Sequence, residues 1–249
     1  MDFVKMEGLG NDFVVVEGPS APTAEEVGRW CDRRRGIGAD GVLAVTPSNS
    51  NSVTMDYWNA DGTPAEMCGN GLRCVARYSV ERGLATSAEF TVTTSLGPRR
   101  VEVGPSKVRV ELGPVEALGG SFELAGYDLA PVLVGNPHAV AFVEDCYAVP
   151  VTTVGPVIEG APHYSERTNV EFATVIDRSR IALRVWERGV GETLACGTGA
   201  AAAVAEAHRS GRTGPSVTVL LPGGELAVEI VDSIAWIEGP ATIVFSGSL

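Results

Sequence analysis

The stretch ETLACGTGAAAAVA, from Glu192 to Ala205, places a cysteine directly before a Gly-Thr-Gly turn and an alanine-rich run. Alanine favours helix, so the run predicts a helix that begins just after Cys196. A thiol at a helix N-terminus lies beside backbone N–H groups that have no partner within the helix. These groups lower thiol pKa values and bind anions. Taken alone, a Cys-Gly pair is more typical of a tight turn with a buried cysteine.

The same arrangement occurs a second time in MCGNGLRCVARY, where Cys68 precedes a Gly-Asn-Gly turn. Cys68 and Cys196 are 128 residues apart, and so are the tryptophans that precede them, Trp58 and Trp186. Further matches at nearly the same offset are Gly69 and Gly71 with Gly197 and Gly199, Gly10-Asn11 with Gly135-Asn136, and Val101-Glu102-Val103 with Val228-Glu229-Ile230. Matches in one order at nearly one offset predict an internal duplication.

The predicted fold class is therefore α/β (α+β), with two pseudo-symmetric halves, each a β-barrel or sandwich wrapped around a central helix. Residues 1–114 are expected to form the first half and residues 115–238 the second, while the closing strand, 239–249, packs back on the first. Glycine, proline, alanine and glutamate dominate between Gly113 and Pro131, where we expect a linker. Related halves tend to pack about a pseudo-two-fold axis. Such packing would direct both cysteine-bearing helix N-termini at one cleft, the expected active site.

Local signals predict the individual elements. Thr23 and Glu26 have the spacing of a capping box and open a helix that is expected to reach Arg34. Asn70 is the predicted N-cap of the helix after Cys68, and Gly83 its predicted stop. A short helical region is expected within 147–162. Strands are predicted at 3–6, 13–17, 42–45, 53–58, 89–94, 100–103, 108–112, 132–134, 181–186, 217–221, 225–231, 235–237 and 242–246, and the segment 165–175 is expected to lead into a strand.

Composition excludes several classes of protein. The chain has 249 residues, of which 45% are hydrophobic, and this is typical of a soluble globular protein. A formal charge of −12 argues against a nucleic-acid groove, which needs clustered lysine and arginine. No apolar run approaches the ~18 residues of a membrane span, and the N-terminus does not resemble a signal peptide. We therefore expect a cytoplasmic protein that binds neither nucleic acid nor membrane.

The sequence also predicts that the protein uses no metal and no cofactor. Lys5 and Lys107 are the only lysines, and neither lies in a recognisable site for a pyridoxal Schiff base. The five cysteines are irregularly spaced and form neither a secreted disulfide framework nor a zinc motif. The three histidines, His138, His163 and His208, complete no ligand set. Three of the cysteines are expected to be small core residues: Cys31, Cys74 and Cys146.

Two thiols that face each other across a cleft suit proton transfer at opposite faces of one carbon. One must be a thiolate that removes the proton, and the other a thiol that returns one from the opposite side. Environments that separate the two titrations achieve such an assignment. Removal of an α-proton from an amino acid also requires stabilisation of charge on its carboxylate. The backbone amides after each cysteine, at Gly69-Asn70 and Gly197-Thr198, can provide it.

These motifs identify a resemblance to the diaminopimelate epimerase family. The similar segments are KMEGLGNDFVVV, RGIGADG, NADGTPAEMCGNGLRC, VGNPH, ERTN and WERGVGETLACGTGA, in the family's order and over nearly the whole chain. The resemblance implies cofactor-independent conversion of LL- to meso-diaminopimelate, in the synthesis of lysine and of the peptidoglycan precursor. It also implies a homodimer. Glu7 and Gly41 depart from the residues that many members have, histidine and glutamine.

The resemblance further implies which residues form the site. Cys68 and Cys196 correspond to the two catalytic thiols. Arg188 suits a distal carboxylate, and Glu187 suits an ammonium group. His138 is a further candidate, for which substrate orientation and simple packing are equally open. The substrate contacts that the resemblance implies are Asn11, Asn59, Gly69, Asn70, Asn136, Asn169, Glu187, Arg188, Gly197 and Thr198.

Alternatives remain open at this point. Asn59 and Asn169 lie in turn-like sequence, where asparagine is common for conformational reasons. The same fold and chemistry could serve another amino acid, as in racemases or epimerases of proline, hydroxyproline or histidine. A cysteine-nucleophile hydrolase would need a histidine base near its cysteine, and neither cysteine motif contains one. In a non-catalytic binding module, both cysteines would be dispensable.

Overall fold

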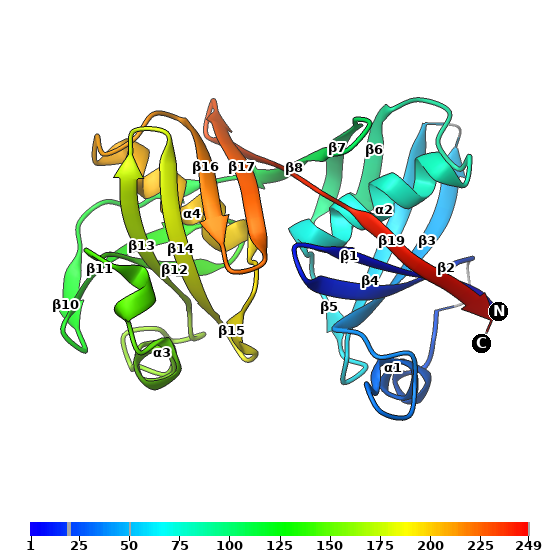
Figure 1. Ribbon diagram of the computed structural model, residues 1–249, viewed down its shortest axis with the longest axis horizontal. Coiled ribbons are helices and arrows are strands. Elements are labelled where there is room, and N and C mark those ends of the chain that lie inside the picture. The colour runs from blue at the N-terminus through cyan, green and yellow to red at the C-terminus, as the bar shows by residue number, and fades with distance from the viewer. Residues whose placement is uncertain (19–20, 50, 249) are drawn as a thin grey trace. The chain divides into compact units, whose positions relative to one another are not determined.

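The computed structural model describes residues 1–18, 21–49 and 51–248. Its contacts divide the chain into two compact units, one of Met1–Val110 with Gly239–Leu249, the other of Glu111–Glu238 (Figure 1). Leu249, the last residue of the predicted closing strand, lies outside the described residues. A membrane-crossing segment is not found among the helices of the described part of the chain.

The first unit is built from strands that pair in a repeating pattern of directions. The antiparallel hairpin β1–β2 is followed by the parallel pair β2–β3, the antiparallel β3–β4, the parallel β4–β6 and the antiparallel β6–β7 and β7–β8. β19 pairs antiparallel with β1. The strands are β1 (Asp2–Gly8), β2 (Asn11–Glu17), β3 (Gly41–Asn49), β4 (Ser52–Asn59), β5 (Pro64–Ala65), β6 (Glu89–Thr94), β7 (Gly97–Val103), the start of β8 (Val108–Pro114) and β19 (Thr242–Ser248), and the helices are α1 (Ala24–Cys31) and α2 (Gly69–Glu81).

The second unit repeats this pattern. The antiparallel β11–β12 leads to the parallel β12–β13, the antiparallel β13–β14, the parallel β14–β16 and the antiparallel β16–β17 and β17–β18. The strands are β9 (Glu116–Ala117), β10 (Phe122–Leu124), β11 (Tyr127–Leu133), β12 (Pro137–Phe142), β13 (Asn169–Asp177), β14 (Arg180–Glu187), β15 (Gly191–Thr193), β16 (Ser216–Leu221), β17 (Gly224–Val231) and β18 (Ile234–Gly239), and the helices are η1 (Cys146–Ala148), α3 (Val151–Glu159) and α4 (Gly197–Arg209).

The registers of the strands confirm that the two halves are pseudo-symmetric. Val42 pairs with Trp58 between β3 and β4, and Val170 pairs with Trp186 between β13 and β14. Both members of the second pair lie 128 positions after those of the first, which is the spacing of the two cysteines. Since a shift of one residue would turn every side chain to the other face of the sheet, an equal register means equal faces. The two units can therefore be compared residue by residue.

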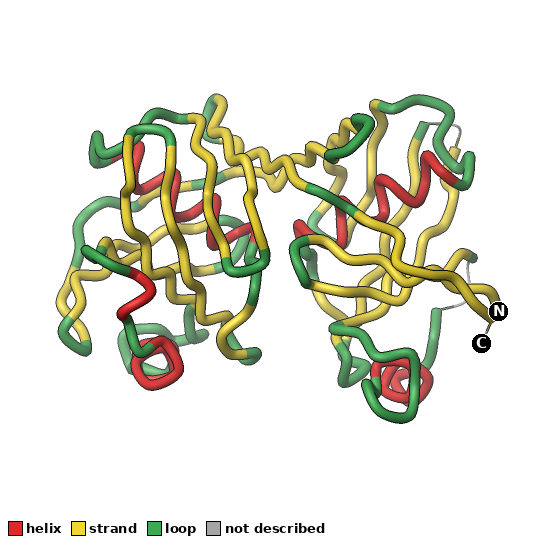
Figure 2. The backbone as a smooth tube through the Cα atoms, viewed as in Figure 1, coloured by secondary structure: helices red, strands yellow, loops and turns green. Residues whose placement is uncertain are grey.

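A central helix is the core of each unit (Figure 2). α4 contacts strands β9, β11, β12, β13, β14, β16 and β17, and α2 contacts strands β1, β2, β3, β4 and β7. Ala200, Ala201, Ala202 and Ala203 are completely buried in α4. The small alanine side chain lets strands approach this helix on several sides, which is why an alanine run suits the position.

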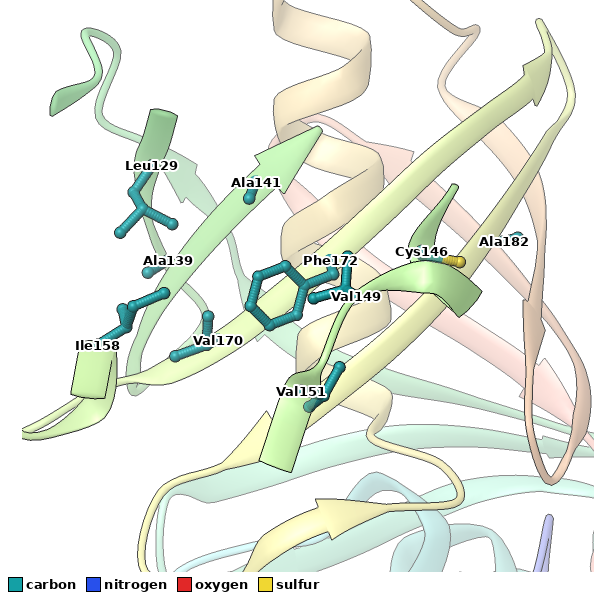
Figure 3. Packing of buried hydrophobic residues seen from close by; sticks show 10 residues of the cluster. All are labelled: Leu129, Ala139, Ala141, Cys146, Val149, Val151, Ile158, Val170, Phe172 and Ala182. Atoms are coloured by element: carbon teal, nitrogen blue, oxygen red, sulfur yellow. The ribbon is translucent and has the colours of Figure 1, made fainter. Parts of the chain in front are cut away.

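A second hydrophobic cluster in each unit lies on the outer side of the strands. In the second unit, η1 and α3 cover β12, β13 and β14, and Cys146, Ile158 and Phe172 are completely buried there (Figure 3). In the first unit, Cys31 of α1 belongs to the corresponding cluster, with strands β2 and β3. Burial raises the pKa of Cys31 to about 11 and that of Cys74 to about 12. The predicted core role of these three cysteines is confirmed.

Two local predictions are wrong. The helix expected to reach Arg34 ends at Cys31, because Asp32 leaves the helical conformation and its carboxylate accepts the N–H groups of Arg34 and Arg35 instead. Its predicted capping box is present, with Thr23 and Glu26 bonded reciprocally. The segment expected to be a linker contains the short strands β9 and β10 and the start of β11, so its glycines and prolines mark turns between strands.

Candidate active site

Cys68 is the N-cap residue of α2. Its backbone is extended, with φ −134° and ψ 122°, and its carbonyl accepts the first helical hydrogen bond, from Leu72 N at 2.8 Å. The prediction that Asn70 caps this helix is wrong, since the helix already begins at Gly69. The amides of the first helical turn therefore follow directly after the thiol, where an anion can be bound.

The side chain of Asn70 is used for a different purpose. Its Nδ2 donates to Asn11 Oδ1 at 3.3 Å, and the Cys68 thiol donates to the same oxygen at 3.4 Å. Its Oδ1 accepts from the guanidinium of Arg73 at 3.0 Å, and Arg73 Nε donates to the carbonyl of Pro240 at 3.1 Å. Arg73 is completely buried, and this burial lowers its pKa. Asn11, Cys68 and Asn70 thus form one hydrogen-bonded cluster, and the hydrogen bond from Arg73 holds the side chain of Asn70 in place.

Asn11 is oriented by a carboxylate. Its Nδ2 donates to Asp40 Oδ2 at 2.8 Å, and because a carboxylate only accepts, the amide oxygen must face Cys68. Arg33 donates to both Asp40 and Asp12, and Lys5 forms an ion pair with Asp12 at 2.7 Å. Asp40 was not among the predicted site residues. The loop RGIGADG carried no signal that its aspartate would reach the β1–β2 turn.

Cys196 is the N-cap residue of α4, and only 6% of it is exposed. Its Sγ accepts the backbone N–H of Gly199 at 3.4 Å and lies 3.5 Å from Thr198 Oγ1. Burial raises its pKa well above the usual value, and the carboxylates of Glu187 and Glu171 raise it further. The helix N-terminus, expected to lower the pKa of this thiol, is therefore outweighed. Burial and the two carboxylates thus favour the thiol form of Cys196 over the thiolate.

Glu187, at the end of β14, lies beside this thiol. Its Oε1 accepts a hydrogen bond from Thr193 Oγ1 at 2.5 Å, and desolvation raises its pKa. The next residue, Arg188, donates its backbone N–H to Asn169 Oδ1 at 2.9 Å and its guanidinium to the carbonyl of Glu166 at 3.1 Å. Asn169 Nδ2 is bonded to the carbonyl of Pro137 at 3.0 Å. Glu187 is thus placed at Cys196, and Asn169 holds the backbone of Arg188.

His138 links two further residues. Its Nδ1 lies 2.7 Å from Glu171 Oε1 and its Nε2 lies 2.9 Å from Asn136 Oδ1. Glu171 was missed by the sequence analysis. The available signal was a charged residue in the middle of β13, where apolar neighbours predict burial on both faces of the strand.

Asn59 takes part in its own turn. Its Nδ2 donates to Thr63 Oγ1 at 3.2 Å and its backbone N–H to the carbonyl of Thr63 at 2.9 Å. This is the conformational role of a turn asparagine, and the side chain is half-buried. In the described part of the chain, histidine, cysteine, aspartate and glutamate side chains form no group of three or more that could hold a metal ion.

Comparison with known proteins adds the following. The family model described as diaminopimelate epimerase matches residues 3–118 and 131–244. A diaminopimelate epimerase of Moorella thermoacetica is 44% identical over 275 aligned positions, covering 99% of this chain and 98% of the relative. One of Pelotomaculum thermopropionicum is 42% identical, with 99% and 98% covered. A solved hydroxyproline epimerase of Agrobacterium vitis has the same fold, with a TM-score of 0.75, 16% identity and coverage of 99% and 91%.

Proposed function

The chain belongs to the diaminopimelate epimerase family, and on this basis we propose that Cys68 and Cys196 are the two acid/base groups that epimerise LL-diaminopimelate to the meso isomer. The enzyme is an isomerase of lysine biosynthesis, as its relatives over the full length of the chain are. The observation that carries the assignment of the thiols is the duplication. Two helices in equivalent places each begin directly after a cysteine.

The reaction moves one proton onto a sulfur and another off a sulfur. The thiolate of one cysteine removes the α-proton and becomes a thiol, which leaves a carbanion at the α-carbon. The thiol of the other cysteine donates its proton to the opposite face and becomes the thiolate, so that the configuration is inverted. Because burial and two carboxylates raise the pKa of Cys196 and so favour its thiol form, Cys196 suits the donor role and Cys68 the role of base.

The substrate carboxylate at the reacting carbon is proposed to bind the first-turn amides of both helices, at Gly69-Asn70 and Gly197-Thr198. Negative charge develops on this carboxylate as the proton leaves, so amides fixed in advance stabilise the transition state more than the ground state. Loss of one such donor typically costs about 3 kcal/mol, or about a hundredfold in rate.

The distal amino-acid head is proposed to be recognised by polar residues near the end of β14. Arg188 can hold a carboxylate in a bidentate fork, and its place is fixed by Asn169. Glu187 would accept from an ammonium group. The remaining proposed contacts are Asn11, Asn59, Asn136 and, as an orienting residue, His138. A second head distinguishes diaminopimelate from proline, hydroxyproline and histidine.

Three further properties form part of the proposal. The chemistry needs only side chains and backbone amides, so we propose that no cofactor takes part. A cytoplasmic location fits two thiols that must stay reduced. A homodimer fits the exposed apolar side chains of β19, Ile243, Val244 and Phe245, which a second copy could cover. Sedimentation analysis tests the last point.

The decisive experiment measures exchange of the α-proton in deuterated water. LL-diaminopimelate should exchange rapidly, whereas proline, hydroxyproline and histidine should not. Cys68→Ala and Cys196→Ala should each lower turnover by at least about a hundredfold, the scale of a lost general acid or base. Cys146→Ala removes a thiol from the cluster under η1 and serves as the matched control. Exchange with one of the other amino acids, and none with diaminopimelate, would refute the proposed substrate.

A further inference from the structure

The duplication allows the surroundings of the two cysteines to be compared position by position. Leu43 pairs with Tyr57 between β3 and β4, and Glu171 pairs with Val185 between β13 and β14. Both members of the second pair follow the first by 128 positions, so Glu171 occupies the place in the second unit that Leu43 occupies in the first. A carboxylate thus replaces an apolar side chain at equivalent sites.

The neighbouring strand shows a matching replacement. Phe13 of β2 pairs with Gly41, and His138 of β12 pairs with Asn169 in the same parallel arrangement. His138 therefore occupies the place of Phe13. An apolar pair, Phe13 and Leu43, stands in the first unit where a polar pair, His138 and Glu171, stands in the second.

Leu43 and Glu171 each lie against the first turn of the central helix of their own unit. A methyl group added at Gly71 would lie 3.2 Å from Leu43 Cδ2 and 3.6 Å from Cys68 Cβ. A methyl group added at Gly199 would lie 2.8 Å from Glu171 Oε1 and 3.4 Å from Cys196 Sγ. The carboxylate of Glu171 and the sulfur of Cys196 thus border the same small space.

Burial of the Glu171 side chain costs free energy. Its side chain and that of His138 are both 0% exposed, and Oε2 has no hydrogen-bond partner among the described residues. A buried carboxylate oxygen without a partner destabilises a fold, whereas the leucine at the equivalent site costs nothing of this kind. Retention of such a group beside a reacting thiol indicates a functional role.

We propose that Glu171 is a positioning residue that makes the two cysteines unequal, by fixing the ring of His138 and by keeping the proton on Cys196. The two helix N-termini differ at the sulfur, since the Cys196 side chain accepts the Gly199 N–H and the Cys68 side chain makes no cap bond. The bond from Gly199 lowers the pKa of Cys196, so burial and side chains must be what keep the proton on this thiol. The groups that face Cys196 are Glu171 from β13, Glu187 from β14, and Thr198 and the Gly199 N–H from α4, with His138 of β12 behind Glu171.

The inference rests on the proposed two-thiol function, because that reaction requires one thiol and one thiolate at the start. Its test is independent of turnover. Alkylation of Cys196 by iodoacetamide, followed by peptide mass spectrometry over a series of pH values, reports the thiolate fraction of this residue alone. Absence of α-proton exchange in the unaltered enzyme would refute the proposed function and leave the alkylation result readable.

Two variants separate the two parts of the role. Glu171→Gln keeps an oxygen for His138 Nδ1 and removes the charge, so Cys196 should be alkylated about tenfold faster at neutral pH, with KM nearly unchanged. Glu171→Leu copies the first unit, so it should show the same gain in alkylation. Because His138 loses its partner at Nδ1 and keeps only Asn136 at Nε2, this variant should also show a several-fold rise in KM.

A matched control is Glu206→Gln. Glu206 is also buried, at 4% exposed, but it lies ten residues beyond Cys196 on α4, or about 15 Å along the helix. Its loss should leave the alkylation of Cys196 unchanged. The inference is overturned if both Glu171 variants retain the wild-type alkylation profile, or if Glu206→Gln changes that profile equally.

Discussion

The salt bridges of Asp12 give a prediction whose size follows from the structure. Asp12 receives two hydrogen bonds from Arg33, at 2.7 and 3.0 Å, and forms an ion pair with Lys5 at 2.7 Å. Burial alone would raise its pKa, but the hydrogen bonds and charges of Arg33 and Lys5 outweigh burial and lower the pKa from 3.8 to about 2. We therefore expect Asp12→Asn to destabilise the first unit.

The sign and size of the effect follow from linkage. A carboxylate whose pKa is lower in the folded state stabilises that state at every pH above its unfolded pKa, and loses this effect as pH falls through its folded pKa. The side chain is 18% exposed, so solvent screens it little. The difference between the two pKa values corresponds to about 2 kcal/mol of unfolding free energy at pH 7. About half of this contribution to the unfolding free energy remains at pH 3.

The assay is urea unfolding followed by tryptophan fluorescence, to which Trp30 and Trp58 of the first unit contribute. Asp12→Asn should have the lower midpoint at pH 7, and the gap to the unaltered protein should narrow steadily below pH 4. Asp128→Asn, at an exposed site on β11, is the control and should not change the midpoint. A gap of constant size from pH 7 to pH 3 would refute the electrostatic argument.

Three further predictions concern single contacts. Gly199→Ala should lower kcat/KM by at least about tenfold, because its methyl group would collide with Glu171 Oε1, whereas unfolding free energy should change less. Asp40→Ala should free the amide of Asn11 and raise KM by about fivefold, while Asp40→Asn, which keeps an acceptor, should not. Thr23→Ala should lower the unfolding free energy by about 1 kcal/mol, measured by urea titration, through loss of the capping box.

Much of the fold could be predicted because the sequence contains the same pattern twice, once for each unit. The spacing of 128 between Cys68 and Cys196 appears again in the registers of β3–β4 and β13–β14. Errors arose where one side chain had a choice of partners. Asparagine is a preferred N-cap residue, which is why the sequence predicts Asn70 as the N-cap of α2. The N-cap residue is Cys68, and the side chain of Asn70 is hydrogen-bonded to Asn11 and Arg73 instead. The contact with Asn11, 59 positions away in sequence, could not be read from the local pattern.

The candidate site could be predicted only in part, for a related reason. Motifs point to groups that lie next to one another along the chain, such as Glu187 and Arg188 or Cys196 and Gly197. Glu171 and Asp40 act on groups contributed by other elements, and nothing in their local sequence indicates those partners. A buried glutamate within a strand was visible as an oddity. Its contacts with His138 and with the first turn of α4 became visible only from the register of β13 against β12 and from the packing of α4.

The duplication raises a problem that the structure helps to resolve. Two copies of one unit provide two similar thiols, whereas transfer of a proton across a carbon starts from one thiol and one thiolate. The cysteine motifs are similar in sequence, since each cysteine is an N-cap residue followed by Gly-X-Gly, although the Cys196 side chain accepts the Gly199 N–H and the Cys68 side chain makes no cap bond. A further difference lies in the strands that pack against the two helices, where Phe13 and Leu43 of one unit correspond to His138 and Glu171 of the other. Exchange of this pair, by His138→Phe together with Glu171→Leu, should therefore make the two thiols more alike in alkylation, even though neither cysteine has been altered.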